Sequence, residues 1–267
     1  MSNNDIIKND EEFIEEIINT DNNKNAVENG VIYVVATPIG NIEDITIRAL
    51  KILRNVDFIL AEDTRVAIRL LNFYKIKKTL FSYHSHSSEY RINEYINEIL
   101  NGKSAAIISD AGTPCISDPG VSIIKIAIEK NIRIVPVGGI SAFTSLLSVS
   151  GLSGNTLFVG FLSNKSGKRK NQLTDLYNNQ KSIIVIYESV YRVKECLEDI
   201  VNIFGEKTDI VIGRELTKQF EQIIRANAKN ILDFFTDGSI LTKGEFSIII
   251  DNRTSKVCEP NAENNLM

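Results

Sequence analysis

The feature that most constrains the fold of this chain is a glycine- and proline-rich loop at residues 109–120. An apolar run at residues 105–108 precedes the loop, and a helix-like pattern at residues 121–128 follows it. This order is typical of a strand–loop–helix corner in an open α/β sheet, where ligands bind outside the carboxyl ends of the strands. Two prolines stiffen the loop, and two glycines allow a ligand to approach its backbone. We therefore interpret residues 109–120 as a ligand-binding loop.

Strand-like and helix-like segments alternate on both sides of this loop. We expect strands at residues 31–36, 56–61, 105–108 and 132–136, and helices at residues 44–53, 62–74, 88–100 and 121–129, with a short helix that ends at residue 149. Strands separated by helices of about 10–15 residues indicate βαβ units and a mostly parallel sheet. The small turn residues at 150–155 are the best candidate for a linker.

Beyond this linker the strands become more closely spaced. We expect strands at residues 157–161, 183–187, 210–213, 222–226 and 246–250, and helices at residues 169–177, 192–203 and 229–235. Such spacing indicates a mixed sheet with antiparallel pairing. The sequence therefore predicts two α/β domains, at residues 30–149 and 150–252, between an acidic extension outside the fold (1–29) and a tail (253–267).

The net charge of −4 is unevenly distributed along the chain. Residues 1–29 carry eight acidic side chains and two lysines, whereas the remainder carries 28 basic and 26 acidic residues. The acidic balance therefore belongs to the extension, and it does not exclude a nucleic-acid partner for the body. The three cysteines are too scattered for a disulfide framework or a zinc site, and no apolar run is long enough to span a bilayer. We expect a cytoplasmic protein.

Several common chemistries find no support in the sequence. Neither a G-x-G-x-x-G segment nor a phosphate-binding G-x-x-x-x-G-K-[ST] loop is present. The two histidines, His84 and His86, have no matching cluster of acids or cysteines, so we expect no metal site. What remains is a set of three loops, at residues 37–41, 109–120 and 138–142. In a parallel sheet these loops share the carboxyl edge and line a site suited to group transfer from a bound donor.

Six segments in a fixed order carry a family resemblance. They are Thr37-Pro38-Ile39-Gly40-Asn41, Ala61-Glu62-Asp63-Thr64-Arg65, the loop at 109–120, Tyr187-Glu188-Ser189 with Arg192, Arg214-Glu215-Leu216-Thr217-Lys218 with Glu221, and Lys243-Gly244-Glu245. Over residues 31–251 the chain resembles the ribosomal RNA small subunit methyltransferase I family of tetrapyrrole-methylase-like (class III) methyltransferases. The resemblance implies two α/β domains with the cofactor in the cleft between them, and a homodimer. It also implies S-adenosylmethionine as methyl donor and a cytidine ribose 2′-hydroxyl in the decoding region of small-subunit (16S) ribosomal RNA as acceptor.

The resemblance also implies site residues. Those of the donor pocket are Thr37, Pro38, Gly40, Asp110, Gly112, Thr113, Ser141, Ala142 and Tyr187. A base near the acceptor hydroxyl assists methyl transfer, and the candidates are Glu62, Asp63 and Lys243, with Glu188 and Glu215 as further carboxylates. An acidic helix start is the alternative interpretation of residues 62–65. For RNA contacts we expect Arg65, Lys165, Lys168, Arg169, Lys170, Arg192 and Lys218, although residues 165–170 also fit a solvated helix start.

The chain departs from the family pattern at three positions. Gly138 and Ile140 replace two prolines on either side of Gly139, and Ser163 stands where the family often has proline. Two other functions remain open at this point. One is a class III methylase that acts on a tetrapyrrole or on a modified histidine of a protein. The other is a non-catalytic protein that binds S-adenosylmethionine or ribosomal particles.

Overall fold

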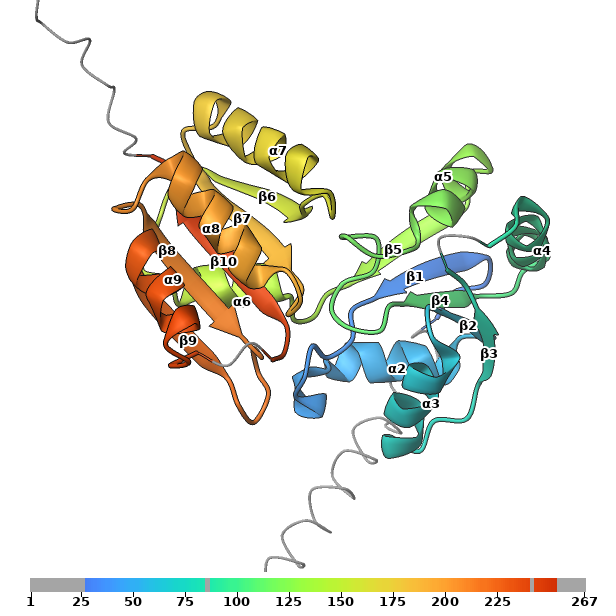
Figure 1. Cartoon of the computed structure of the whole chain (residues 1–267). Coiled ribbons are helices and arrows are strands. Elements are labelled where there is room, and N and C mark those ends of the chain that lie inside the picture. Colours follow the sequence, from blue (N-terminus) through green and yellow to red (C-terminus); the bar gives the residue numbers. More distant parts are fainter. Residues whose placement is uncertain (1–26, 85–86, 241–242, 254–267) are drawn as a thin grey trace, which may run out of the picture. The chain divides into compact units, whose positions relative to one another are not determined.

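The computed structural model describes residues 27–84, 87–240 and 243–253, and the chain divides into two compact units (Figure 1). Unit 1 is Met1–Ala142 and unit 2 is Phe143–Met267. The division falls after the first residue of the short helix at Ala142–Ser148, so the rest of this helix and the turn residues at 150–155 lie within unit 2. Nearly all of the predicted acidic extension and of the tail lie outside the described residues.

Unit 1 contains a parallel sheet, as predicted, and this sheet has five strands. Its strands are β1 (Val31–Val35), β2 (Phe58–Ala61), β3 (Thr79–Ser82), β4 (Ala105–Ile108) and β5 (Arg133–Val137). The strand order is β3-β2-β4-β1-β5, and every pairing is parallel. Strand β3 was not predicted, because it is a four-residue edge strand whose side chains are only partly buried.

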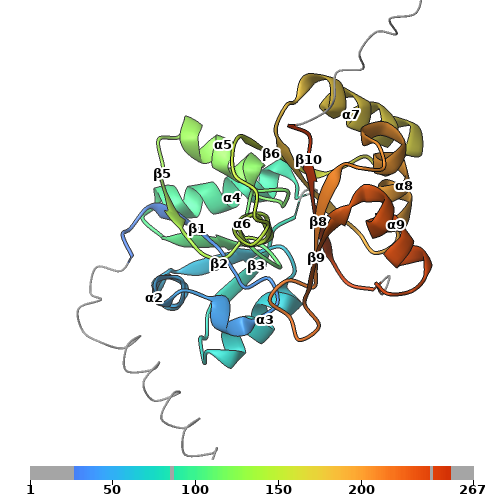
Figure 2. The ribbon, with the colours of Figure 1, turned by 90° about the vertical axis from the view of Figure 1, so that its left-hand side faces the viewer.

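Helices cover both faces of this sheet (Figure 2). The helical segments are η2 (Ile42–Asp44), α2 (Ile47–Asn55), α3 (Thr64–Phe73), α4 (Glu89–Leu100) and α5 (Val121–Glu129). Successive side chains of a strand point to opposite faces. Accordingly Tyr33 of β1 packs in the cluster with α2 and α3, whereas its neighbour Ile32 packs with α4 and α5.

The connections that leave β1 and β4 run in opposite directions along the sheet. From β1 the chain passes through α2 to β2, and from β4 it passes through α5 to β5 on the other side of β1. Because α2 and α5 cover opposite faces, the carboxyl ends of β1 and β4 form a topological switch point. In open α/β sheets this is the position at which ligands bind.

Unit 2 contains the predicted mixed sheet. Its strands are β6 (Thr156–Phe161), β7 (Ile183–Glu188), β8 (Asp209–Arg214), β9 (Gln222–Asn227) and β10 (Phe246–Asp251), in the order β6-β7-β10-β8-β9. Strands β6 and β7 are parallel, while β10 is antiparallel to β7 and β8, and β8 is antiparallel to β9. The carboxyl ends of β6, β7 and β8 and the amino ends of β9 and β10 therefore share one edge.

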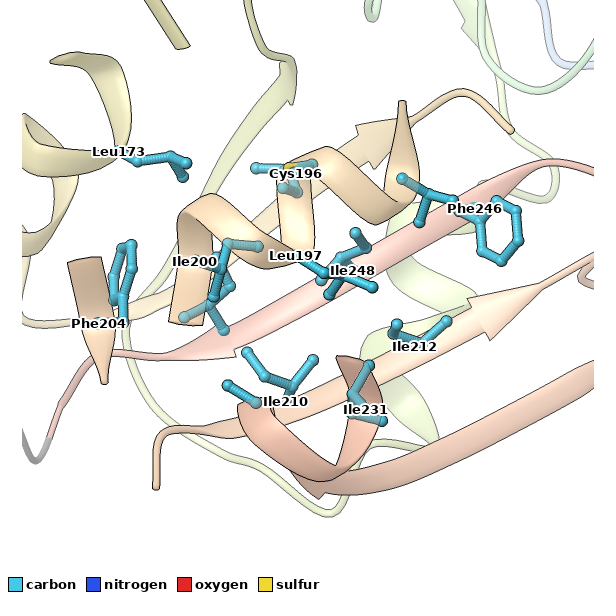
Figure 3. Packing of buried hydrophobic residues seen from close by; sticks show 14 of the residues in the cluster. Leu173, Cys196, Leu197, Ile200, Phe204, Ile210, Ile212, Ile231, Phe246 and Ile248 are labelled. Carbon is cyan, nitrogen blue, oxygen red and sulfur yellow. The ribbon is translucent and has the colours of Figure 1, made fainter. Parts of the chain in front are cut away.

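Three helices of unit 2 cover one face of its sheet. The helices of this unit are α6 (Ala142–Ser148), α7 (Ser166–Asn179), α8 (Val193–Phe204) and α9 (Ala228–Thr236). Leu197 and Ile200 of α8 and Ile231 of α9 are buried against Ile210 and Ile248 of the sheet (Figure 3). Burial of one such side chain contributes about 1.5–3 kcal/mol, so this cluster holds the helices in place.

None of the helices in the described part of the chain combines the length and the apolar character needed to cross a bilayer.

Candidate functional site

The loops that follow β1 and β4 are joined by backbone hydrogen bonds at the switch point of unit 1. The Thr37 amide donates to the Gly112 carbonyl at 2.9 Å, and the Gly112 amide donates back to the Thr37 carbonyl at 3.1 Å. The Thr37 hydroxyl adds a bond to the Ser109 carbonyl at 3.0 Å and is buried. Three of the residues predicted for the donor pocket, Thr37, Gly112 and their loop neighbour Asp110, thus lie together.

The loop after β5 approaches the same strand end. The Ala36 amide donates to the Val137 carbonyl at 3.1 Å. A Cβ placed on Gly139 would lie only 2.7 Å from the Ala36 Cβ, so only glycine fits there without displacement. At Gly138 a Cβ would meet nothing within 4 Å. Gly139, which the family shares, is therefore required for steric reasons. Gly138, which replaces a family proline, has space for a side chain.

The loop at residues 109–120 has an unusual backbone. Cys115 and Ser117 adopt φ values of +69° and +68°, a left-handed conformation that non-glycine residues rarely take. Gly120 has φ +138°, and a Cβ there would lie 2.3 Å from the Cys115 sulfur. Such conformations persist only where the surrounding structure fixes them, and they concentrate at functional sites.

Carboxylates from β2 and β4 meet beside this loop. The Asp63 amide donates to the Asp110 carboxylate at 3.0 Å, and the Asp110 amide donates to the Glu62 carboxylate at 3.4 Å. Burial raises the pKa of Glu62 and of Asp110, and neighbouring carboxylates raise both further. The edge of unit 1 therefore has an excess of negative charge.

Asp118 belongs to the same acidic group and was missed in the sequence. Burial raises the pKa of Asp118 to about 7, with further contributions from Glu62 and Asp110. In the sequence, Asp118 is only an acidic residue near the end of the predicted ligand-binding loop. Its proximity to Glu62 results from the fold. We call Glu62, Asp110 and Asp118 the acidic group.

Asp63 has a different environment from these three. Its carboxylate accepts from the Arg65 amide at 2.8 Å as the N-cap of α3, and it pairs with the Arg65 guanidinium at 2.6 Å. These bonds to Arg65 hold the pKa of Asp63 at about 2. The helix-start interpretation of this segment therefore describes Asp63, which is a poor proton acceptor near neutral pH. The Arg65 side chain remains largely exposed.

The remaining residues predicted for the donor pocket follow the same strands, with one exception. Pro38, Gly40, Thr113, Ser141 and Ala142 lie in or directly after the three loops of unit 1. Tyr187 belongs to β7 of unit 2, where its hydroxyl accepts from the Phe143 amide at 3.0 Å. Its ring packs edge-on against Phe158 and Phe161. A donor contact for Tyr187 stays a prediction.

In unit 2, three of the recognised segments converge on one edge of the sheet. Phe246, the first residue of β10, pairs with Glu188 at the end of β7 and with Arg214 at the end of β8. We call this the unit 2 edge, formed by the β6–α7, β7–α8 and β8–β9 connections and the segment before β10. Glu188 and Phe246, which are more than 50 residues apart in the sequence, therefore lie on neighbouring strands.

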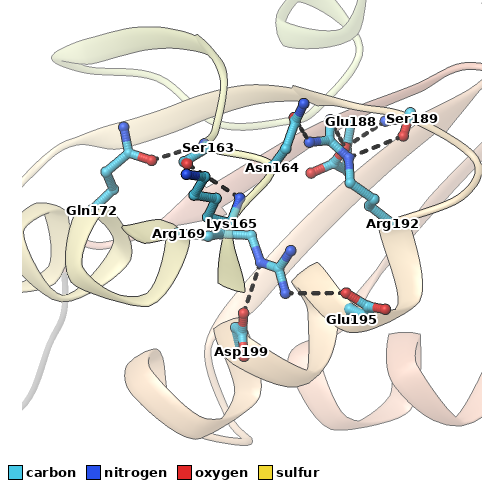
Figure 4. Close-up of polar contacts among 10 residues, drawn as sticks. All are labelled: Ser163, Asn164, Lys165, Arg169, Gln172, Glu188, Ser189, Arg192, Glu195 and Asp199. Carbon is cyan, nitrogen blue, oxygen red and sulfur yellow. Dashed lines mark hydrogen bonds and ion pairs between the residues drawn. The ribbon is translucent and has the colours of Figure 1, made fainter. Parts of the chain in front are cut away.

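A buried ion pair organises the β7–α8 connection (Figure 4). The Glu188 side chain has no exposed surface and pairs with Arg192 at 2.7 Å, while accepting from the Ser189 amide at 2.6 Å. Arg192 also bonds the Ser189 hydroxyl at 3.2 Å and the Asn164 side chain. The other Glu188 oxygen, Oε2, is buried without a hydrogen-bond partner. Glu188 and Arg192 thus connect the loops that follow β6 and β7.

A second network joins the β8–β9 connection to the start of β10. The buried Arg214 donates to the Lys243 carbonyl at 2.6 Å. Lys218 bridges Glu215 and Glu245 at 2.9 and 3.0 Å. Glu215 has a φ of +51°, and Gly244 is required opposite it, because a Cβ there would lie 2.5 Å from the Glu215 side chain.

The basic segment before and within α7 does not act as a uniform cationic surface. Lys165 and Lys168 are exposed, and Lys170 is half exposed, 3.6 Å from Asp199. Arg169 is only 2% exposed and pairs with Asp199 at 2.7 Å (Figure 4). The RNA contact that we predicted for Arg169 does not fit this burial. Arg169 instead anchors α7 on α8, and the sequence could not show this because Asp199 is 30 residues away.

No group of three or more metal-ligating side chains is assembled within the described residues, which include His84 but not His86.

A groove of about 760 Å³ is present elsewhere in unit 1. It is lined by Asp57, Phe58, Thr79, Phe81, Glu94, Tyr95, Asn97, Glu98 and Lys103. Because Phe58 and Thr79 begin their strands, this groove is at the amino edge of the sheet, away from the three loops.

Comparison with known proteins identifies the class to which this fold and these loops belong. Residues 31–232 match the family model of the tetrapyrrole (corrin/porphyrin) methylases. Among solved structures, a cobalt precorrin-4 methyltransferase superimposes with a TM-score of 0.60 at 18% identity, covering 82% of this chain and 94% of that one. The methyltransferase CobJ gives a TM-score of 0.62 at 14% identity, covering 86% and 97%. At these identities the likeness shows the fold alone.

Curated relatives narrow the assignment. The ribosomal RNA small subunit methyltransferase I of Thermotoga maritima is 41% identical over 84% of this chain and 99% of its own length. The protein of the same name from Haemophilus influenzae is 39% identical over 88% and 81%. The chain therefore belongs to the ribosomal RNA small subunit methyltransferase I family within the tetrapyrrole methylases. It is a methyltransferase, and its methyl donor is S-adenosylmethionine.

The chemistry of the unit 1 edge fits this donor. S-adenosylmethionine carries a sulfonium and an ammonium cation, and burial together with the neighbouring carboxylates raises the pKa values of the acidic group. The nearby Arg65 pairs with Asp63 instead. The carboxylates of this edge are complementary to a cationic ligand, and the close-packed glycines leave the backbone accessible.

Proposed function

We propose that this protein transfers the methyl group of S-adenosylmethionine to the ribose 2′-hydroxyl of a cytidine in the decoding region of small-subunit ribosomal RNA. The observation that carries the donor side is the junction of Thr37, Gly112 and Gly139 at the switch point, beside the acidic group. Membership of a family whose curated members are named for small-subunit RNA methylation supports the acceptor. We further propose that the protein acts in the cytoplasm and as a homodimer.

Thr37, Pro38, Gly40, Gly112, Thr113, Ser141 and Ala142 hold the donor through backbone and hydroxyl groups in this proposal. When bound, the donor supplies an electrophilic methyl group on a positively charged sulfur. Asp110 pairs with the cationic or hydroxyl groups of the donor, because it lies two residues before Gly112 in the same loop and its carboxylate belongs to the acidic group. Positioning of the acceptor oxygen about 3–3.5 Å from the methyl carbon is then the main contribution of the protein.

We assign the acceptor proton to the acidic group. In the reaction the hydroxyl oxygen forms a bond to the methyl carbon, the sulfur–carbon bond breaks and the hydroxyl proton leaves. A carboxylate whose pKa is near 7 takes that proton more readily than Asp63, whose pKa is about 2. Asp118 is therefore the favoured acceptor, Glu62 is a second candidate because burial raises its pKa too, and Lys243 of the unit 2 edge remains a candidate for orienting the hydroxyl.

The direct test is transfer of radiolabelled methyl groups to purified small ribosomal subunits. We expect label in the RNA after protein is removed, and none when the enzyme is omitted. Label in a ribosomal protein or in an added tetrapyrrole would instead support another class III activity. Tight donor binding by calorimetry without label on any subunit form would indicate a non-catalytic protein.

A further inference from the structure

The three connections at the unit 2 edge each present an exposed aromatic ring. Phe161 ends β6, Tyr191 precedes α8, and Phe220 lies between β8 and β9. Their exposed fractions are 53%, 90% and 68%, which are large values for side chains of this size. Exposed apolar side chains are normal when scattered, but a group of rings along one edge indicates a binding surface.

Polar networks hold the backbone beside Tyr191 and Phe220, and a ring contact holds Phe161. Tyr191 is next to Arg192, which the buried Glu188 and the Ser189 hydroxyl hold. The Phe220 carbonyl accepts from Arg214 at 3.2 Å. Phe161 packs edge-on against Tyr187, with ring centres 5.6 Å apart. A backbone that is already held in place reduces the conformational entropy lost when a flat partner stacks on the rings.

Cations accompany the rings. The connections of this edge, at residues 162–168, 187–192, 214–221 and 243–245, carry six basic and four acidic side chains. Glu188 and Glu215 bind Arg192 and Lys218, whereas Lys165, Lys168 and Lys243 are exposed. Aromatic rings interspersed with exposed cations match the chemistry of single-stranded nucleic acid, whose bases stack and whose phosphates are anionic.

We propose that Tyr191 and Phe220, with Phe161, stack on unpaired bases of an RNA strand whose phosphates contact Lys165, Lys168 and Lys243. This inference deepens the proposed function, on which it rests, because it names the residues that recognise the RNA acceptor. It requires the acceptor segment to be single-stranded where it contacts unit 2, since paired bases cannot stack on these rings.

The test compares the full chain with Tyr191→Ala and Phe220→Ala, using fluorescence anisotropy with a labelled single-stranded RNA dodecamer. Loss of one stacked ring is expected to weaken binding by about 5- to 100-fold. Tyr191→Phe and Phe220→Tyr keep the rings and should bind as the wild type does. Tyr90→Ala removes an equally exposed ring from α4 of unit 1 and should leave RNA affinity unchanged.

The salt dependence of RNA affinity separates the contribution of the phosphate contacts from that of ring stacking. Lys165→Ala should lower the slope of log affinity against log salt by about 0.7, whereas Tyr191→Ala should leave the slope unchanged. Unaltered affinity in both alanine variants would overturn the inference, as would equal losses in Tyr191→Phe and Tyr191→Ala. A change only in the affinity for whole subunits, not for the dodecamer, would point to a ribosomal protein and would also overturn it.

The same variants distinguish failure of this inference from failure of the proposed function. Methyl transfer by the wild type to small subunits decides the function alone. If the wild type methylates RNA and the ring variants retain its KM, only the stacking assignment fails. If the wild type transfers nothing yet binds RNA through these rings, only the function fails. Donor affinity by calorimetry should be unchanged in every ring variant.

Discussion

The edges of the two sheets that carry the recognised segments are built by different means. In unit 1 the loops are joined by backbone hydrogen bonds, with glycines at the points of closest approach and an excess of carboxylates. In unit 2 the connections are joined by charged side chains, among them Glu188–Arg192 and Lys218 with its two carboxylates. The first construction suits a small cationic donor held by the backbone. The second suits a large anionic acceptor held by side chains.

If unit 2 depends on side-chain ion pairs, removal of a buried partner should be the most damaging change. We expect Asp199→Ala to lower the free energy of unfolding by about 3–5 kcal/mol, because it leaves the Arg169 charge buried and uncompensated. Glu195→Ala removes the other carboxylate near Arg169, but Glu195 is 64% exposed and 3.4 Å away. Its cost should be below about 1 kcal/mol. Urea denaturation of both variants measures the difference, and equal costs would contradict it.

If unit 1 depends on backbone packing, one added methyl group should distinguish two adjacent glycines. Gly139→Ala should destabilise the protein by about 1–3 kcal/mol, because the new Cβ meets the Ala36 Cβ at 2.7 Å. Gly138→Ala should be neutral or stabilising by up to about 1 kcal/mol, through a less flexible unfolded chain. Melting temperatures of the two variants provide the measurement. The same loss in both would show that the junction with Ala36 is not tight.

The acidic excess of unit 1 predicts a stability that depends on pH. Because the pKa of Asp118 is raised to about 7 in the folded state, the native protein binds more protons than the unfolded chain between about pH 4 and pH 7. Stability should therefore fall as pH rises through this range. Asp118→Asn should raise the free energy of unfolding by about 1–2 kcal/mol at pH 8, allowing for solvent screening, and change it little at pH 4. A constant difference at both pH values would contradict the assignment.

The same excess predicts a change in donor binding. Asp110→Ala should weaken S-adenosylmethionine binding by about tenfold, or about 1.4 kcal/mol, with the fold intact. Asp209→Ala is the matched control, because it removes an exposed aspartate at the start of β8 in unit 2. Isothermal titration calorimetry should show unchanged affinity there. Unchanged affinity in Asp110→Ala would remove Asp110 from the donor site.

The sequence was most informative where local pattern determines structure. Hydrophobic alternation and turn residues predicted nearly every described strand and helix within a few residues, and the strand–loop–helix corner at residues 109–120 was located correctly. Among the described strands only β3 was missed, because a short edge strand with partly buried side chains has no strong apolar run. A parallel sheet then places the loops after β1, β4 and β5 at one edge.

The properties of individual side chains were less predictable, because they depend on partners distant in sequence. Arg169 looked like a surface cation, yet Asp199 on the next helix neutralises it in the interior. Asp63 looked like a candidate base, yet its bonds to Arg65 lower its pKa. Nothing in the sequence indicated that Asp118 lies near Glu62, because only the fold brings these two residues together. The sequence pattern therefore predicted which loops meet at the edge of the sheet, but it did not predict the charge state or the partners of the side chains there.

The most direct test of the central claim is the map of ribose methylation on small-subunit ribosomal RNA from cells with and without this protein. Mass spectrometry of nuclease fragments should show one 2′-O-methylcytidine in the decoding region that is absent without the protein and restored by adding it with S-adenosylmethionine. Identical maps from both cells, or a methyl group on a base instead of a ribose, would contradict the account.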